Sequence, residues 1–513
     1  MPSNPANSST PRPSNPGRSI PAAAAPACAD PRTPGAHRGN WLVVALSVVV
    51  LTVAVLQTAV VPVLGVIADQ LGVSTVAASW AVTANLLAAA AATPLIGRLA
   101  DLHRKKRVLL IVLVVVLVGC LLAATTASLA VLIVARVLQA ASFALYPISI
   151  AILREELRPG RMGSAMATLS GTLGFGGGAS LVAVGLLMSG TPAYHRVFWL
   201  TTAFTVIVLA IVVFVVPDRP PGTTGSVDWL GAVGLAAGLT STLLAITQGN
   251  TWGWGSPATI ASAAGGVVIL LGWWFWEQRT ARPLVSTRML SQRTMLFTNL
   301  ATIFVGMGLY FAFLGLTQFV QIPRDPNDPG GYGFGADVLE ASVVYLLPGA
   351  LAGFLIALIS GRFIDRFGAR PVLVVAALAG IAGFLLIAFA HSSPWQVIVA
   401  GILANAYISL GYGALPALVV GEVTAGETGI ATSMNAIART VGSATAAAIV
   451  AVLLSRTSAT GTPMESSFVA IFLGGAATAA LAMLLIARSQ PRAPSAGAVA
   501  ARYESRAMNH EWG

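Results

Sequence analysis

Charged side chains are scarce in this chain. Of its 513 residues only 9% are Asp, Glu, Lys or Arg, whereas 56% are hydrophobic. Soluble domains carry about 25% charged residues, so this composition excludes a water-soluble globular fold. The apolar residues come in runs of roughly 20, the length of helix that crosses about 30 Å of hydrocarbon. The sequence therefore predicts an all-α polytopic membrane protein.

Cysteine and histidine are also rare, with two and five copies. Cys28 lies in a polar segment and Cys120 in an apolar run, so neither a disulfide framework nor a metal cluster is expected. The sequence shows no paired carboxylates, no metal-ligand set and no glycine loop of the P-loop type. It therefore predicts neither an enzyme nor an ATP-driven pump, and no cofactor or metal is expected.

Fourteen apolar runs follow a tail without helical periodicity. The tail, residues 1–40, is rich in Pro, Ser, Asn and Ala and cannot bury enough apolar surface to order itself. We predict a disordered cytoplasmic tail there. The expected spans are 41–64, 77–97, 108–127, 129–152, 163–188, 196–216, 229–248, 258–277, 296–320, 340–361, 371–391, 395–418, 429–454 and 467–487.

The net charge of +11 could indicate a nucleic-acid partner. No basic face with interleaved aromatics is present, however, so no nucleic acid is expected. The charge lies in short loops and tails, where it sets orientation. With the N-terminus inside, three loop arginines face outward: Arg196, Arg324 and Arg456. The inner loops then hold residues 98–107, Arg154, Arg158, Arg161, Arg219, Arg279, Arg282, Arg288, Arg293, Arg362, Arg366 and Arg370. We predict a multi-pass protein of the cell inner (cytoplasmic) membrane, with both termini cytoplasmic.

A charged string lies between spans two and three, and a similar string lies between spans ten and eleven. The string Gly97–Arg107 has a counterpart in Gly361–Arg370. An offset of 264 aligns Gly97, Arg98, Asp101 and Lys106 with Gly361, Arg362, Asp365 and Arg370, and an offset of 266 aligns Gly163 with Gly429 and Gly176 with Gly442.

The near-constant offset predicts two six-helix halves. These are 41–216 and 296–487, with an inserted helix pair in a linker region at 217–295 and a cytoplasmic tail at 488–513. Two related halves that handle substrate between them form a recurring transporter architecture. Chance similarity between Gly- and Ala-rich helices is the alternative.

The charged string resembles the signature loop of the major facilitator superfamily. Fourteen spans, together with Gln318–Gln321, Arg136–Gln139 and Tyr194–Trp199, resemble its fourteen-span drug:proton antiporter branch. The resemblance implies a secondary active transporter that exports hydrophobic or cationic drugs by alternating access, with protons, a small-molecule substrate and membrane lipid as partners. It also implies multidrug efflux and antibiotic resistance.

The alternative keeps the fold and changes the substrate. The exported compound would be an endogenous metabolite or lipid whose anionic group binds Arg136 and Arg439, with another coupling ion or none.

The resemblance also implies a conformational latch on the cytoplasmic side. Gly97 is expected where two helix ends approach closely, and Asp101 is expected to pair with Arg98, Arg104 or a neighbouring helix. This contact would break when the halves rock, whereas the alternative is charge that only sets orientation. The expected latch residues are Gly97, Arg98, Asp101, Arg104, Lys106, Gly361, Arg362, Asp365 and Arg370. The family pattern has Gly where Arg104 stands, and Gly368 keeps that glycine in the second copy.

Two arginines are expected deep in the membrane. Arg136 would lie about 10 Å and Arg439 about 15 Å along their spans, where a charge normally faces a cavity or a partner. The resemblance implies proton transfer for Arg136. Related antiporters usually carry an aspartate in the first span, but here Gln57 occupies that region, and a Gln57–Arg136 hydrogen bond would fix geometry without carrying a proton. Packing at a helix interface is the alternative. The coupling or cavity candidates are Gln57, Arg136, Gln139, Asn435 and Arg439.

Aromatic and amide side chains in two spans are candidates for the substrate cavity. They are Trp80, Asn85, Phe304, Tyr310 and Phe311. Apolar walls with a few polar groups suit lipophilic ligands. Contact with lipid is the alternative for each aromatic residue.

Overall fold

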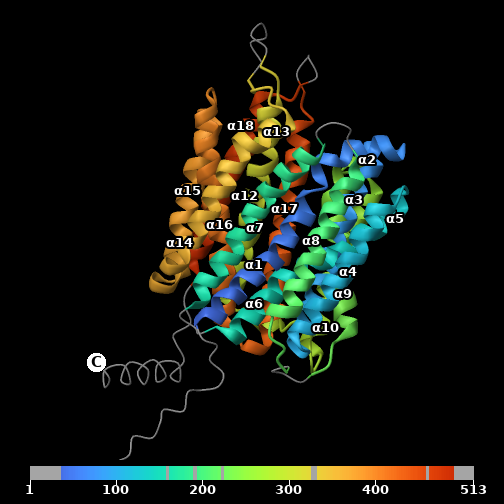
Figure 1. Cartoon of the computed structure of the whole chain (residues 1–513), viewed down its shortest axis with the longest axis vertical. Coiled ribbons are helices and arrows are strands. Elements are labelled where there is room, and N and C mark those ends of the chain that lie inside the picture. Colours follow the sequence, from blue (N-terminus) through green and yellow to red (C-terminus); the bar gives the residue numbers. More distant parts are fainter. Residues whose placement is uncertain are drawn as a thin grey trace, which may run out of the picture.

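The computed structural model describes residues 36–157, 161–188, 193–220, 225–324, 332–457 and 462–489. Its elements are helices, and fourteen helical segments are long and apolar enough to cross a membrane (Figure 1). The prediction of an all-α polytopic protein with fourteen spans is therefore confirmed. Most of the two predicted tails lies outside the described residues. Residues 36–40, assigned to the first tail, instead form the start of the first helix.

The first six spans comprise eight α-helices and two 3₁₀ turns. Their bounds are α1 (Ala36–Thr58), a 3₁₀ turn (Val61–Val63), α2 (Leu64–Leu71), α3 (Thr75–Leu102), α4 (Lys105–Thr125), α5 (Leu129–Gln139), a 3₁₀ turn (Ala140–Ala144), α6 (Leu145–Glu156), α7 (Met162–Met188) and α8 (Tyr194–Val215). The helices extend beyond the predicted spans at several ends because their polar end turns also adopt helical backbone.

The next two spans form a helix pair, and the last six spans repeat the arrangement of the first six. Their bounds are α9 (Trp229–Trp252), α10 (Pro257–Arg279), α11 (Thr287–Ser291), α12 (Arg293–Gln321), α13 (Val338–Glu340), a π-helical turn (Ala341–Leu346), α14 (Leu347–Phe367), α15 (Ala369–Phe389), α16 (Pro394–Glu422), a 3₁₀ turn (Ala425–Glu427), α17 (Thr428–Leu454) and α18 (Glu465–Arg488).

Helix contacts follow the internal repeat. In the first six spans α1 packs on α7, and in the last six α12 packs on α17. Between the two sets, α3 packs on α17 and α7 packs on α14. The helix pair packs through α9 against both α3 and α17, and α10 packs mainly on α9. Helix α9 therefore covers one seam between the two six-span sets, which we call the first and second halves.

Three spans depart from α-helical geometry partway along their length. Pro62, which has no N–H to donate, lies in the 3₁₀ turn between α1 and α2. A second 3₁₀ turn separates α5 from α6, and the π-helical turn precedes α14. Such turns inside helices frequently mark functional sites. Here they contain Val61, Phe143 and Leu346, which all line the central cavity described below.

Helices α12 and α17 approach so closely that their backbones touch. A Cβ atom on Gly442 would lie 1.9 Å from the Ile303 carbonyl oxygen, and one on Gly306 would lie 2.3 Å from the Arg439 carbonyl oxygen. Small residues permit this kind of helix packing in membranes. The contact fixes the backbone of α17 beside Arg439.

The substitution Gly442→Ala should lower the free energy of unfolding by about 1–3 kcal/mol, because the added methyl group forces two backbones apart. Thermal unfolding of the purified protein in detergent measures this. Gly272→Ala is the matched control, since a Cβ atom there meets nothing within 4 Å. Equal melting temperatures for the two variants would contradict the packing argument.

Candidate functional site

A cavity of about 410 Å³ lies between the two halves. Its volume falls within the range of small-molecule sites. Side chains from both halves and from α9 form its wall, and most of them are aliphatic or small. The aromatic members are Phe143, Tyr310, Phe313, Phe384, Tyr412 and Phe472.

The cavity extends toward one end of the bundle. Helices α1, α9 and α17 all start at the end that carries the two charged strings, which we call the latch end. Leu64, Asn250 and Ala451 line the cavity near or beyond the far ends of these helices. The cavity therefore extends away from the latch end.

Polar groups in the cavity wall are few. The amides are Gln57, Asn250 and Asn405, and the one Asp, Glu, Lys, Arg or His side chain among the described lining residues is Arg439. Gln57 Nε2 donates to the Tyr310 hydroxyl at 3.4 Å, which joins the two halves across the cavity. No carboxylate belongs to this described wall.

Three of the predicted cavity or coupling residues line the wall: Gln57, Tyr310 and Arg439. Four others do not belong to the described wall. Trp80 and Phe304 pack against hydrophobic clusters at helix interfaces. Phe311 is buried and packs near Gly474, and Asn85 is buried and donates Nδ2 to the Arg136 carbonyl at 2.8 Å.

The sequence reasoning missed several wall residues. Asn405 and Asn250 were detectable as amides near or within apolar runs. Phe313, Phe384 and Phe472 had no such signal, because the surrounding helices are apolar on all sides.

Arg136 is fully buried outside the cavity wall and joins three helices. Its Nε donates to the Ala81 carbonyl at 2.9 Å, and its Nη1 donates to the Leu56 carbonyl at 3.1 Å and to Gln139 Oε1 at 2.6 Å. The considered Gln57–Arg136 hydrogen bond is therefore replaced by one to the backbone of the preceding residue. Arg136 satisfies carbonyl groups that water cannot reach.

The other polar candidates in the bundle also make contacts between helices. Gln139 Nε2 donates to Cys120 Sγ at 3.6 Å. Asn435 is buried and donates Nδ2 to Asn299 Oδ1 at 3.0 Å and to Thr302 Oγ1 at 2.7 Å. These residues pack α4 against α5 and α12 against α17, and neither lines the cavity.

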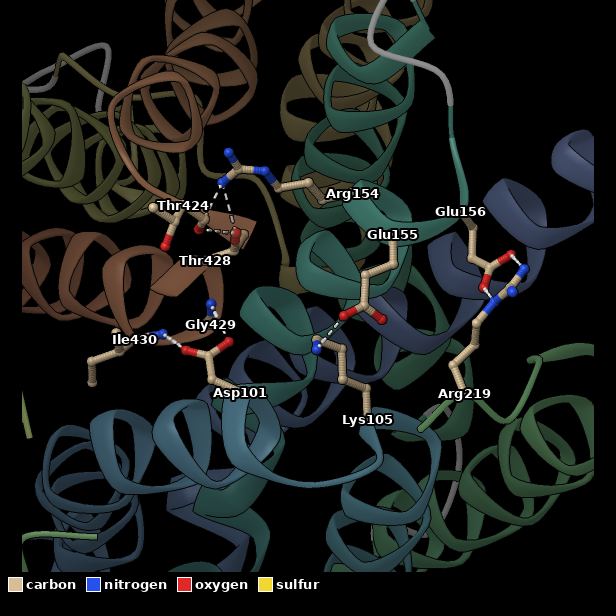
Figure 2. A network of polar contacts seen from close by, with 10 residues as sticks. All are labelled: Asp101, Lys105, Arg154, Glu155, Glu156, Arg219, Thr424, Thr428, Gly429 and Ile430. Carbon is tan, nitrogen blue, oxygen red and sulfur yellow. Dashed lines mark hydrogen bonds and ion pairs between the residues drawn. The ribbon is translucent and has the colours of Figure 1, made fainter. Parts of the chain in front are cut away.

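At the latch end, Asp101 caps a helix of the opposite half. Its Oδ1 accepts from the Gly429 N–H and its Oδ2 from the Ile430 N–H, both at 2.9 Å, at the start of α17 (Figure 2). The Asp101 side chain is 1% exposed. A carboxylate is favourable there because the first N–H groups of a helix lack backbone partners and carry partial positive charge.

Asp365 makes the equivalent contact in the reverse direction. Its Oδ1 accepts from the Gly163 N–H at 3.0 Å and its Oδ2 from the Ser164 N–H at 3.2 Å, at the start of α7. Each half thus supplies one carboxylate and receives one. Asp365 is exposed, whereas Asp101 is buried.

The two latch glycines lie where helices from opposite halves touch. A Cβ atom on Gly97 would lie 2.1 Å from Ser433 Oγ, and one on Gly361 would lie 2.3 Å from Ser164 Cα. Neither position has room for a side chain without displacing the partner helix.

The basic members of the charged strings contact other groups. Arg104 pairs with Asp218 at 2.8 Å, and Lys106 Nζ donates to the Val213 carbonyl at 2.8 Å. Arg98 and Arg370 are half-buried, and Arg362 is exposed. The expected partner of Asp101 is thus identified as the neighbouring helix, through the backbone N–H groups of α17.

Arg154 is a latch-end contact that the sequence reasoning missed. From the end of α6 it donates Nη1 to Thr428 Oγ1 at 2.7 Å (Figure 2). Its Nη2 donates to the Val423 carbonyl at 2.5 Å. It thereby holds the segment that leads into α17. The Arg-Glu-Glu run in which it lies was the available signal.

The two glutamates that follow Arg154 tie the same helix to its neighbours. Lys105 pairs with Glu155 at 2.5 Å, and Arg219 pairs with Glu156 (Figure 2). The hydrogen bonds that Arg219 donates to the Glu156 carboxylate raise the pKa of Arg219 above its usual value.

Buried acids in the described part of the chain are confined to the latch end. They are Asp101, Glu156 and Glu277. Glu277 lies in the last turn of α10, where its Oε1 accepts from Trp273 Nε1 at 3.0 Å.

Asp101→Asn should loosen the latch end more than Asp365→Asn. Charge-assisted hydrogen bonds are worth about 1.5–3 kcal/mol each, so we expect the population open at this end to rise at least about tenfold for the buried position. Spin labels on the exposed sites Arg107→Cys and Arg366→Cys, in a Cys28→Ser background, measure the separation of the halves. Unchanged distance distributions in Asp101→Asn would contradict the latch.

Arg136→Met should destabilise the protein by about 3 kcal/mol or more, because it removes three buried hydrogen bonds, to the Ala81 and Leu56 carbonyls and to Gln139 Oε1. Arg107→Met, at an exposed site, is the control. Thermal unfolding separates the two. Equal stability of both variants would argue that Arg136 acts in transport without a structural role.

Comparisons with known proteins agree with this architecture. The model of the Major Facilitator Superfamily matches residues 46–325 and 299–507. The chain is similar to the human organic anion transporter MFSD10 (TETRAN), with a TM-score of 0.62 at 16% identity over 87% of this chain and 99% of that one. This likeness concerns the fold.

Curated relatives include transporters with different named substrates. A uridine/deoxyuridine transporter of Lactococcus lactis subsp. cremoris is 29% identical over 62% of this chain and 66% of its own length. An uncharacterized transporter of Mycobacterium tuberculosis is 30% identical over 68% of this chain, but the match spans about half of that relative, 49%. The cephamycin export protein of Amycolatopsis lactamdurans is 28% identical over 82% of this chain and 88% of its own length.

Proposed function

This chain belongs to the Major Facilitator Superfamily, and we propose that it is a secondary active transporter that exports hydrophobic small molecules by alternating access. One observation carries the proposal. A cavity of about 410 Å³ lies between two halves that are joined at one end by reciprocal carboxylate–helix contacts. A substrate held there would change sides when the halves rock about it.

The latch contacts suit a reversible closure. Hydrogen bonds from Gly429 and Ile430 to Asp101, and from Gly163 and Ser164 to Asp365, use backbone donors that water can satisfy once the halves part. Opening therefore exposes no uncompensated buried group at these two points. The cost of switching remains small enough for substrate or ion binding to drive it.

We place the latch end at the cytoplasmic side of the cell membrane, with both termini inside. The basic loops gather at this end, and cytoplasmic loops carry an excess of Lys and Arg. The direction of transport is proposed by analogy with the relative named as a cephamycin export protein.

The wall chemistry narrows the proposed substrates. Aliphatic and aromatic side chains suit lipophilic compounds. A lipophilic cation would meet Arg439 and no carboxylate in the described cavity wall. We therefore propose hydrophobic compounds without a positive charge as substrates. The cationic drugs expected from the sequence are not among them.

We retain the proton gradient as the proposed driving force. A titrating carboxylate would then lie outside the described cavity wall. Asp101, Glu156 and Glu277, the buried acids at the latch end, are the candidates for carrying the proton.

Dye efflux tests both parts of this proposal. Cells that produce the protein and are preloaded with Nile red, a neutral hydrophobic dye, should lose it faster than cells carrying an empty vector. Asp101→Asn should slow this efflux, because the cytoplasmic closure is weakened, while Gly272→Ala serves as the control. A protonophore should stop it.

The results of this assay distinguish export of hydrophobic compounds from proton coupling. Efflux equal to that of the empty vector, with the protein present in the membrane, would overturn the export of neutral hydrophobic compounds. Efflux that continues in the presence of the protonophore would leave export standing and reject proton coupling.

A further inference from the structure

Arg439 is a cation in the middle of an apolar cavity. It lies near the midpoint of α17 and is the one charged side chain of the described cavity wall. A charge at this depth is costly and marks a functional site by default. The guanidinium therefore needs stabilising contacts at this position.

The contacts of Arg439 leave its N–H groups unused. Its guanidinium carbon lies 4.6 Å from the ring centre of Tyr412 and 5.2 Å from that of Tyr146. These cation–π contacts cover the faces of the group, whereas hydrogen bonding requires its five N–H donors in the plane. Among the described residues, neither a hydrogen bond nor a carboxylate contact of the Arg439 guanidinium is found.

Arg136 provides the internal comparison. It is fully buried outside the cavity and its donors reach two carbonyl oxygens and one amide oxygen, whereas Arg439 is half-buried. The fold therefore can satisfy a buried arginine with its own acceptors. At Arg439, on the cavity wall, it supplies two aromatic rings and, among the described residues, no hydrogen-bond acceptor for the guanidinium.

The aromatic faces around Arg439 are held in place. The Tyr146 hydroxyl and Ser170 Oγ lie 2.8 Å apart and 3.0 and 2.8 Å from the Tyr412 carbonyl oxygen, so the two hydroxyls share their two protons within this group. The backbone of Arg439 itself is fixed by the contact of its carbonyl group with Gly306. A site fixed in this way loses little conformational freedom when a ligand binds.

We propose that Arg439 is an anion-binding site and that the transported compounds are organic anions. This rests on the proposed function and replaces its substrate class with a narrower one. The ligand carries one carboxylate, sulfonate or phosphate group, which accepts hydrogen bonds from the guanidinium. A hydrophobic, partly aromatic body occupies the rest of the cavity beside Phe313, Phe384 and Phe472. Bound anion and Arg439 neutralise each other in a site of low polarity.

Three probes with one ring system test the charge preference. These are 2-naphthoate, 2-naphthamide and 2-naphthylmethylammonium, titrated calorimetrically into the full chain in lipid nanodiscs. Naphthoate should bind at least about tenfold more tightly than the amide, because charge-assisted hydrogen bonds form only with the carboxylate. The ammonium probe should bind more weakly than the amide.

Matched variants assign the preference to Arg439. Arg439→Gln should reduce naphthoate affinity to that of the amide while amide affinity stays unchanged, and Arg439→Lys should keep part of the preference. Arg456→Gln is the control. Arg456 is an exposed arginine just beyond the end of α17, so its removal should leave all three affinities unchanged.

Naphthoate binding no tighter than amide binding, including no measurable binding of any probe, would overturn the anion site. So would a naphthoate preference that persists in Arg439→Gln. If Arg439→Gln fails to fold, the ranking of the three probes on the unmodified chain decides alone. Amide binding without anion preference rejects the anion site and leaves the proposed exporter standing, whereas anion-selective binding in a protein that does not remove Nile red keeps the site and rejects only the export of neutral compounds.

Discussion

A carboxylate bound to the first N–H groups of a helix in the opposite half is the contact on which the closed end of this bundle depends. It occurs twice, at Asp101 on α17 and at Asp365 on α7. Helix starts lack backbone acceptors, so each acid supplies what the opposite half needs. The glycines beside them, Gly97 and Gly361, let the helices approach closely enough for these bonds to form. With this end closed, open volume remains toward the other end.

The two latches share geometry but differ in surroundings. Asp101 is 1% exposed and lies beside Arg154, which binds the segment entering α17, whereas Asp365 is exposed to solvent. Charge interactions gain strength as water is excluded, so the first latch contributes more to closure. The internal repeat therefore conserves the contact and changes its strength.

Hydropathy and the repeat were enough to predict the fourteen spans and the paired charged strings, because both depend on side-chain type along the chain. The partner of Asp101 could not be read in the same way, since backbone N–H groups carry no residue signature. The cavity wall was equally hidden. Phe313 lines the cavity and Phe311 does not, yet both lie in one apolar run of α12. In a helix that is apolar on all sides, only packing decides which face is open.

Two arginines, one fully buried and one half-buried, show how packing decides the role of a residue. Arg136 donates hydrogen bonds to acceptors of the protein and joins three helices. Arg439 lines the cavity, and its guanidinium contacts two tyrosine rings. Their estimated depth in the membrane made both arginines candidates for the cavity or for coupling. A cavity that contains one cation and no acid cannot release a proton from its own described wall, so proton coupling and substrate binding would involve separate groups. An anion leaving a cell with a negative interior is, in addition, favoured by the membrane potential, by about 2.3 kcal/mol per charge for each 100 mV. The negative charge of the bound molecule would then let the membrane potential supply part of the driving force for export.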